Sequence, residues 1–324
     1  MRAVRVHELT GPSGLRVDEV PSPRPSGGQV LIDVKAAGVN FPDILITQGK
    51  YQFKPTPPFS PGGEASGIIS EVGPGVTSLK VGDRVATTLL YGAYAEQVVA
   101  PEMATVKLPD AVPFDVGAAT LLTYATTYHA LVDRAALQAG ETLLVLGAAG
   151  GVGTSAVELG TLLGAKVIAA ASSPEKLAFC REHGAKETID YVKEDLKDRV
   201  KALTHGNGVD VIYDPVGGAL SEAALRSIAW KGRFLVVGFA AGDIPKIPLN
   251  LVLLKGCQIV GVFWGQFAMR ESALNRAHCE KLFAWVAEGK LGPKIDATLP
   301  FEQAGEALAR LARREVKGKL VLVP

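Results

Sequence analysis

Cysteine is scarce in this sequence, which holds only three, Cys180, Cys257 and Cys279, among 324 residues. The three lie far apart along the chain and form no C-x-x-C pair. This spacing argues against a disulfide framework and against a structural zinc knot. We expect three reduced thiols that are mostly buried, because a free cysteine usually behaves as a small hydrophobic residue.

An excess of charge of one sign is also lacking. The 34 lysines and arginines against 33 aspartates and glutamates give a formal net charge of +1, and no long run of one sign occurs. We therefore expect neither nucleic acid nor an anionic membrane as a partner. No stretch approaches the roughly 18 apolar residues of a membrane-spanning helix. The first residues, MRAVRVHELTGPSGL, have no apolar core before a cleavage site, which favours a cytoplasmic protein.

The length of the chain exceeds what one hydrophobic core usually supports. It predicts two domains of roughly 100 to 200 residues each, and a cleft between them is the natural place for a site. The first hundred residues have short alternating runs, such as 30–34 and 67–72, between Gly and Pro clusters. This punctuation is typical of a small, barrel-like β domain.

From about residue 120 the pattern changes to buried apolar runs that alternate with helical stretches. Six runs can be followed, TLLVLG, KVIAAA, ETID, VDVIYD, RFLVVGF and QIVGVFW. Six such runs predict an α/β fold with a doubly wound parallel sheet of six strands.

The segment after about residue 267 predicts a helix over 274–288, a strand in DATLP, a helix over 301–313 and a last strand in KLVLV. We expect these closing pieces to return to the first domain. The domain with the parallel sheet would then be inserted into the sequence of the other domain.

A glycine turn follows the first of the six runs. TLLVLG leads into AAGGVG at 148–153 and then into the helical pattern TSAVELGTLLGA. This is the strand, turn and helix of a dinucleotide site, in which Gly150 lets the backbone approach the pyrophosphate and Gly153 lets the helix pack on the strand. Ala148 replaces the first glycine of the usual G-x-G-x-x-G. Such a turn can also be only a tight connection, but its place in the series of runs favours the nucleotide. The residues expected at the pyrophosphate are Ala149, Gly150, Gly151, Val152 and Gly153.

The second run ends in AAASSPEK at 169–176, without the acidic residue that would bind the ribose 2′-hydroxyl of NAD. NADPH is therefore favoured as the cofactor. Ser172 and Ser173 can donate hydrogen bonds to a 2′-phosphate, and Lys176 can supply a compensating charge. The alternatives are a solvated helix lysine for Lys176 and plain helix capping for Ser173.

Several separated motifs, together with this turn, carry a family resemblance. They are AAGVNFPD at 36–43, PGGEASGIISEVGPGVTSLKVGDRV at 61–85 and GFAAGDIPKIPLNLVLLKGCQIVGVFWG at 238–265. With them the chain resembles the medium-chain dehydrogenase/reductase superfamily, and more narrowly its zinc-independent NADPH:quinone oxidoreductase branch. The resemblance runs from the first strand to the closing GKLVLVP.

The resemblance implies a GroES-like catalytic domain over 1–124 plus 268–324 and a Rossmann NADPH-binding domain over 125–267. It also implies a homodimer joined through the last strand of the nucleotide sheet, near Gln258 to Trp264. In zinc-bearing relatives a cysteine stands at the position of Asn40 and a histidine at that of Gly63, before Glu64. Both ligands are missing here, and so is the four-cysteine loop expected after Asp83, so we expect no metal.

At the reactive end, the resemblance places Asn40 and Asp43 of the NFPD loop, with Tyr51 nearby and Thr126 at the domain crossing. Tyr51 could donate to a developing oxyanion. Leu45 replaces a second tyrosine of some relatives, which leaves water or the cofactor ribose open as the proton source. The alternative for Asn40 and Asp43 is that they only cap a short helix.

On the cofactor side, the resemblance places Tyr191 against the adenosine phosphate and four residues, Gly238, Phe239, Phe263 and Trp264, beside the nicotinamide. Packing is the alternative for Tyr191, and core or dimer contact is the alternative for the two aromatic residues Phe263 and Trp264. His129 in TTYHAL is expected to be a buried, satisfied core histidine rather than a catalytic one.

The implied function is hydride transfer from NADPH to a quinone or a related conjugated carbonyl compound. Alcohol oxidation on this scaffold needs a Lewis acid, whereas an acceptor that is already activated can be reduced without one. Two alternatives stay open: reduction of the double bond of an enone or enoyl thioester, and a catalytically idle NADPH-binding protein. The pattern does not identify the acceptor, because acceptor pockets are lined by loops without a diagnostic motif.

Overall fold

Two main sheets organise the chain, and each belongs to a separate unit. The structure is a computed structural model that describes residues 1–324. The first unit comprises Met1–Ala125 together with Phe267–Pro324, and the second comprises Thr126–Gln266.

The first unit is built on a seven-stranded sheet in the order β14-β15-β3-β4-β5-β7, with β6 also paired to β3. Its neighbouring strands are antiparallel except for the parallel pair β14 and β15. A separate antiparallel pair is formed by β1 and β2. The strands are β1 (Arg2–Val6), β2 (Leu15–Glu19), β3 (Gln29–Val39), β4 (Glu64–Val72), β5 (Arg84–Thr88), β6 (Gln97–Pro101), β7 (Thr105–Lys107), β14 (Ile295–Pro300) and β15 (Lys319–Val323).

Strand β3 is the centre of the first unit because it pairs with β4, β6 and β15. Its side chains Val30, Ile32 and Val34 are at most 3% exposed and share one core cluster with Leu320 and Leu322 of β15. Burying a side chain of this kind contributes about 1.5–3 kcal/mol. The last strand of the chain is thereby bound to a strand near its beginning.

Helices and short turns complete the first unit. Helix α2 packs on β3 and β4, and α1 contacts α11. The helices are α1 (Phe41–Thr47), α2 (Phe114–Thr120), α10 (Ser272–Ala287) and α11 (Ala304–Ala312), with the 3₁₀ turns η1 (Pro12–Gly14), η2 (Glu102–Ala104) and η5 (Phe301–Gln303) and the π-helical turn η3 (Leu121–Ala125).

The second unit contains a fully parallel six-stranded sheet in the order β10-β9-β8-β11-β12-β13. This order is that of a doubly wound dinucleotide-binding sheet, so the predicted fold class is confirmed. Each of the six apolar runs supplies one strand. The strands are β8 (Thr142–Leu146), β9 (Lys166–Ala171), β10 (Glu187–Asp190), β11 (Val209–Asp214), β12 (Ile228–Val236) and β13 (Gln258–Gly261).

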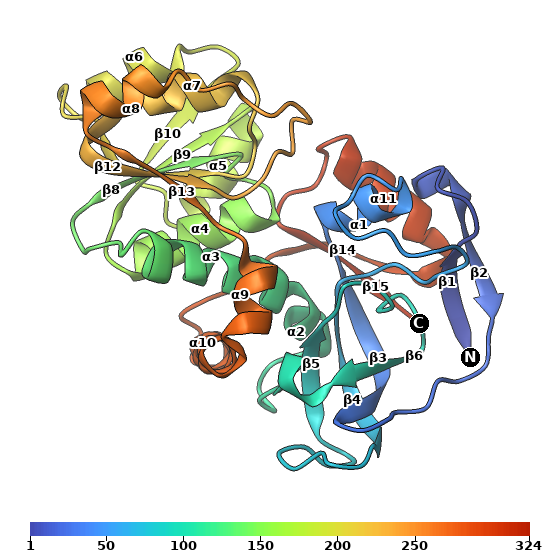
Figure 1. Ribbon diagram of the computed structural model, residues 1–324. Helices are drawn as coiled ribbons and strands as arrows, with labels where there is room; N and C mark the ends of the chain where they lie inside the picture. The colour runs from blue at the N-terminus through green and yellow to red at the C-terminus, as the bar shows by residue number, and fades with distance from the viewer. The chain divides into compact units, whose positions relative to one another are not determined.

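Helices cover both faces of this sheet. Figure 1 shows α6, α7 and α8 on one face and α3 and α4 on the other. The helices are α3 (Thr126–Tyr128), α4 (Gly151–Leu162), α5 (Pro174–Glu182), α6 (Leu196–Leu203), α7 (Ala219–Arg226) and α8 (Leu249–Lys255), with the π-helical turn η4 (His129–Arg134). Helix α9 (Trp264–Arg270) lies where the sequence passes from the second unit into the first.

Helix α4 approaches the turn after β8 very closely. A Cβ atom at Gly153 would lie 2.2 Å from the Gly147 carbonyl oxygen, and one at Gly160 would lie 2.6 Å from a methyl group of Leu143. The atoms that a side chain at Gly153 would meet belong to the backbone of Gly147 and Ala148, which cannot move aside, so only glycine permits this packing. At Gly150, by contrast, the nearest atom would be 3.5 Å away.

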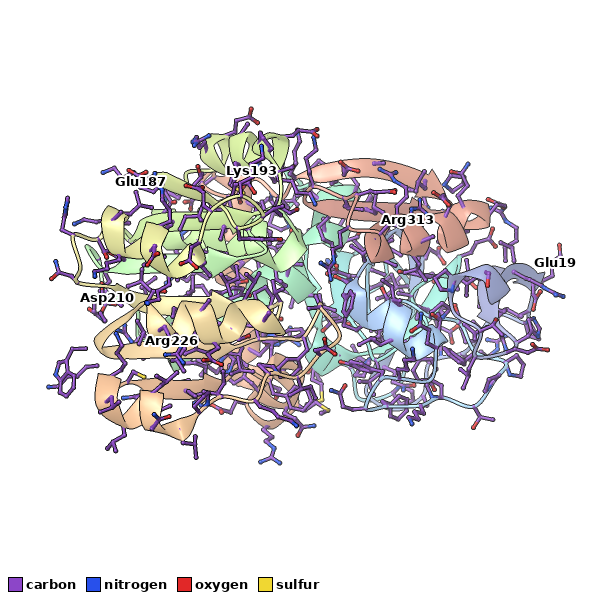
Figure 2. All side chains as sticks on the ribbon, turned by 90° about the horizontal axis from the view of Figure 1, so that it is seen from above. Glu19, Glu187, Lys193, Asp210, Arg226 and Arg313 are labelled. Carbon is purple, nitrogen blue, oxygen red and sulfur yellow. The ribbon has the colours of Figure 1, made fainter.

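Most charged side chains are at least partly exposed on the outside of the two units. The labelled residues Glu187, Lys193 and Arg226 of the second unit and Glu19 and Arg313 of the first are all exposed (Figure 2). None of the helices has both the length and the apolar character that crossing a bilayer requires.

Candidate functional site

A buried polar network lies where β3 ends and α1 begins. Asn40 is the N-cap of α1 and is 4% exposed, and Asp43, in the first turn, is 3% exposed. The Asn40 backbone N–H donates to Asp43 Oδ2 at 2.8 Å. The two residues therefore do cap the helix, as one alternative proposed. Their other partners show that capping is not their whole role.

A lysine from the last strand enters the same network. Lys319 Nζ donates to Glu64 Oε1 at 2.6 Å, to Asn40 Oδ1 at 2.5 Å and to the Val39 carbonyl oxygen at 3.1 Å. Asn40 Nδ2 donates to Glu64 Oε1 at 2.9 Å. Lys319 and Glu64 are 4% and 1% exposed, so the ion pair is shielded from water and both ends of the Asn40 amide are occupied by protein.

Strand register brings these residues together. In the antiparallel pairing of β15 with β3, Leu320 is opposite Val39, which puts Lys319 beside Asn40. In the pairing of β3 with β4, Gly38 is opposite Glu64. A Cβ atom at Gly38 would lie 2.3 Å from Glu64 Oε1, so a glycine is needed for the carboxylate to reach the lysine.

The carboxyl group of Asp43 has an unusual environment. Burial raises its pKa from 3.8 to about 6, although the hydrogen bonds from Tyr94 and the Asn40 N–H and the charge of Lys319 act in the opposite direction. The negative charge of Glu64 also raises this pKa. The result is a carboxyl group that exchanges its proton close to neutral pH, as a general acid requires.

The two oxygens of Asp43 differ in their partners. Oδ2 accepts from Tyr94 OH at 2.8 Å as well as from Asn40. Oδ1 points toward Gly63, where a Cβ atom would lie 3.8 Å from it, and it accepts no hydrogen bond from the protein. One oxygen is thus fixed by the fold and the other is open for an external group.

The charge of this carboxyl group acts on two phenols, those of Tyr51 and Tyr94. Burial, and then the charge of Asp43, raise the pKa of Tyr51. The same two causes, with the hydrogen bond to Asp43, raise the pKa of Tyr94 well above its ordinary value. Both phenols therefore stay protonated, and Tyr94 donates a hydrogen bond to the carboxyl group.

In the second unit, the candidate cofactor residues all follow the carboxyl ends of parallel strands. The turn after β8 contains the buried Ala149 and leads to Gly150, the N-cap of α4. The first N–H groups of α4, on Gly151, Val152 and Gly153, have no acceptor within the helix. A helix N-terminus of this kind suits the pyrophosphate of a dinucleotide.

Ser172, Ser173 and Lys176 are brought together after β9. Ser173 is the N-cap of α5, and its Oγ accepts from the Lys176 backbone N–H at 3.3 Å, so the capping alternative describes a real contact. Lys176 Nζ also lies 3.5 Å from Ser172 Oγ. Two hydroxyls and an ammonium group therefore meet at one strand end, beside Ala171 rather than beside an acidic residue.

The remaining cofactor candidates follow β10, β12 and β13. Tyr191 is half-buried and packs against the core of the second unit. Gly238 donates its N–H to the Asp214 carbonyl oxygen at 3.3 Å, and the next residue, Phe239, is 37% exposed. Phe263 and Trp264 differ sharply, with exposed fractions of 56% and 9%.

Two further residues singled out in the sequence lie in the second unit. Thr126 begins α3, and its neighbour Thr127 forms a buried hydroxyl cluster with Ser155 Oγ at 2.7 Å and Tyr213 OH at 2.8 Å. His129 is 7% exposed and its Nδ1 lies 2.7 Å from Asp133 Oδ2. A buried histidine with a partner is what the sequence favoured.

Comparison with known proteins gives consistent results over the whole chain. The family model "Alcohol dehydrogenase GroES-like domain" matches residues 26–110, and the model "Zinc-binding dehydrogenase" matches residues 151–279. The quinone oxidoreductase-like protein 2 homolog of Nematostella vectensis is 42% identical over 99% of this chain and 88% of its own length. The quinone oxidoreductase of Pseudomonas aeruginosa is 36% identical over 97% of both chains. The crystal structure of Escherichia coli quinone oxidoreductase complexed with NADPH is 30% identical, covers 100% of both chains and has a TM-score of 0.93.

The chain belongs to the quinone oxidoreductase branch of the medium-chain dehydrogenase/reductase superfamily. It is an oxidoreductase, and the predicted pairing of a GroES-like domain with a Rossmann sheet is confirmed.

The zinc named in one of the two family models does not fit the residues of this oxidoreductase. Asn40 offers a neutral amide whose oxygen already accepts from the Lys319 ammonium group, and Gly63 offers no side chain. The nearby Glu64 carboxylate is paired with the same lysine. No three histidine, cysteine, aspartate or glutamate side chains of the chain gather in a way that could hold a metal ion.

Sequence reasoning missed three members of the oxidoreductase network, namely Glu64, Tyr94 and Lys319. Tyr94 is completely buried, and its hydroxyl reaches Asp43 from a loop 51 residues further along the chain. Lys319 lies 279 residues from Asn40. A lysine that begins the otherwise apolar run KLVLV is the one signal in the sequence, because a lysine inside a buried strand needs an acidic partner.

We predict that Asp43→Asn changes how stability depends on pH. A folded-state pKa of about 6 against 3.8 means that the folded protein binds the proton more tightly. The stability from Asp43 is thus fully present below pH ~4 and is lost as the pH rises to ~6, a difference of about 3 kcal/mol. Asparagine resembles the protonated acid and has no such loss. Urea unfolding at several pH values from 4 to 7 measures the free energy of unfolding of the variant and the wild type.

The matched control is Asp110→Asn, because the Asp110 side chain is fully exposed and a surface ion pair contributes little. The advantage of the Asp43→Asn variant over the wild type should grow with pH, whereas that of the control should stay constant. A constant difference for Asp43→Asn as well would show that its carboxyl group titrates normally.

Proposed function

We propose that this oxidoreductase transfers hydride from NADPH to a quinone or a related conjugated carbonyl compound without a metal. The observation that carries the proposal is the Asp43 carboxyl group, which has one fixed oxygen, one open oxygen and a pKa near 6. It lies in the part of the first unit where the resemblance puts the metal in zinc-bearing relatives. Here that region offers a proton instead of a Lewis acid.

NADPH as the cofactor is supported by the strand end after β9. Ser172, Ser173 and Lys176 meet there, and this group suits a 2′-phosphate better than a free 2′-hydroxyl. The similar Escherichia coli enzyme was crystallised with NADPH. We propose that Ala149 to Gly153 bind the pyrophosphate, Tyr191 the adenosine end, and Gly238, Phe239, Phe263 and Trp264 the nicotinamide.

The chain's own residues would handle the charge that reduction creates. NADPH, when bound, supplies the hydride. The reduced acceptor then carries a negative charge on oxygen, to which Tyr51 can donate a hydrogen bond and Asp43 can give its proton. Asp43 regains a proton from water. We assign Asn40 the task of holding the Asp43 carboxyl group through its backbone N–H, and we keep Thr126 as a further polar group for the acceptor.

Turnover with a panel of acceptors tests this function. We expect NADPH to be oxidised by quinones faster than by alkenals or enoyl thioesters, and a zinc chelator to leave the rate unchanged. Asp43→Asn should lower kcat for the quinone by about 100-fold, since general acid catalysis contributes about 10²–10⁴, while the affinity for NADPH stays the same. Loss of the nicotinamide absorbance band measures the rates.

Other outcomes of the same panel would replace the proposal. A preference for enoyl thioesters would make the protein a double-bond reductase. Inertness toward every acceptor, with NADPH still bound, would indicate a binding protein without activity. A chelator that abolishes turnover would refute the metal-free chemistry.

The choice between NADPH and NADH can be tested at Lys176. Lys176→Ala should weaken NADPH binding by about tenfold or more and leave NADH almost unaffected, because only NADPH carries the 2′-phosphate that an ammonium group pairs with. Titration calorimetry with both nucleotides measures this. The nearby Lys186, an exposed residue between α5 and β10, gives the control variant Lys186→Ala. Equal losses for both nucleotides in Lys176→Ala would contradict the phosphate assignment.

We further propose a homodimer formed through the free edge of β13, the outermost strand of the parallel sheet. An unpaired edge strand offers backbone donors and acceptors to a second strand, and Ile259 on it is 39% exposed. The same unit exposes Leu249, Leu253 and Leu254 of α8, each by 70% or more. Exposed apolar groups of this size are typical of interfaces.

Sedimentation equilibrium tests the dimer. Ile259→Lys places a charge on the edge that a second strand would have to bury, so the variant should be a monomer at concentrations where the wild type is a dimer. An unchanged far-UV circular dichroism spectrum would show that the variant is folded. A wild type that sediments as a monomer would refute the interface.

A further inference from the structure

Two aromatic side chains of the first unit stack on each other at its surface. Phe53 lies in the segment between α1 and β4, and Tyr91 lies in the segment between β5 and β6. Their ring centroids are 5.7 Å apart and their planes differ by 19°. Both remain open to solvent, with exposed fractions of 42% and 39%. We call these two residues the aromatic pair.

The aromatic pair packs on a third, buried aromatic side chain. The Tyr91 ring meets Phe59 edge-on, with centroids 5.9 Å apart and an interplanar angle of 81°. Phe59 is only 4% exposed, and its backbone exchanges two hydrogen bonds with Val6. The position of the pair is therefore fixed by packing against a buried side chain.

The same two segments also reach the Asp43 carboxyl group. The Leu89 N–H donates to the Gly63 carbonyl oxygen at 2.8 Å, and a Cβ atom at Gly63 would lie 3.5 Å from the Leu89 carbonyl oxygen and 3.8 Å from Asp43 Oδ1. Tyr91 follows Leu89 by two residues. Phe53 in turn follows Tyr51 by two residues, and the charge of Asp43 contributes to the raised pKa of Tyr51. Both rings are therefore carried by segments that also contribute to the surroundings of the Asp43 carboxyl group.

The chemistry of exposed rings indicates what such a surface can bind. Large apolar side chains are normally buried, and a group of them at the surface marks a site of contact. Aromatic faces attract other flat π-systems in offset stacks, in addition to the gain from covering apolar area. A flat ring of an electron-poor acceptor matches both demands, whereas a short flexible enone offers little surface to stack.

We propose that the aromatic pair selects the acceptor by stacking on its ring system, so that fused-ring quinones bind better than single-ring quinones and small aliphatic enones. This inference rests on the proposed function and narrows its substrate class. Phe53 and Tyr91 determine specificity, and neither transfers a proton or hydride.

Steady-state kinetics of Phe53→Ala and Tyr91→Ala with 1,4-naphthoquinone, 1,4-benzoquinone and an aliphatic enone test the proposal. Each variant should raise KM for the naphthoquinone by about tenfold, change KM for the enone by less than about twofold, and leave kcat unaltered. Tyr91→Phe and Phe53→Trp keep the rings and are the matched controls, which should retain a low KM for the naphthoquinone. Tyr91→Phe also shows whether the Tyr91 hydroxyl takes part.

Equilibrium dialysis of the oxidised naphthoquinone against the protein separates this inference from the proposed function. Binding that weakens in Phe53→Ala supports the stacking surface even if the wild type does not oxidise NADPH. Equal changes of KM for all acceptors, or unchanged naphthoquinone binding in both alanine variants, would overturn it. Phe53 alone suffices for the test if Tyr91→Ala does not fold.

Discussion

The first unit depends on a buried ammonium group that is held between a carboxylate and an amide. Lys319 Nζ contacts Glu64 Oε1, Asn40 Oδ1 and the Val39 carbonyl oxygen, and so it connects the last strand to the two strands at the centre of the sheet. Removing one partner of a buried ion pair costs about 3–5 kcal/mol. The polar site can therefore exist only when the end of the chain has closed onto its beginning.

The same buried network also determines the surroundings of the Asp43 carboxyl group. With both ends of its amide occupied, Asn40 fixes the start of α1, and the backbone N–H of Asn40 together with Tyr94 fixes one oxygen of Asp43. Burial keeps the proton on that carboxyl group to a higher pH, while the nearby ammonium limits the shift. The network thus holds a group that can release a proton near neutrality, and its other oxygen remains open.

The second unit gathers its candidate residues by strand topology rather than by a buried ion pair. All its candidate cofactor residues follow parallel strands, so the topology alone gathers them at one edge of the sheet. The glycine at 153 is required by the 2.2 Å approach to Gly147. Local spacing is enough to identify such a turn in the sequence, and the binding of the pyrophosphate there is our proposal.

The sequence by itself determined the six parallel strands, the glycine turn, the absence of an acid after β9 and the family, because each of these is written in residues close together in the chain. It also pointed to Asn40, Asp43 and Tyr51 through the resemblance. Only the tertiary structure decided that Glu64, Tyr94 and Lys319 join them and that Phe53 stacks on Tyr91. Those contacts depend on strand register and on where loops fold back, and residues 279 positions apart carry no local pattern that reports their meeting.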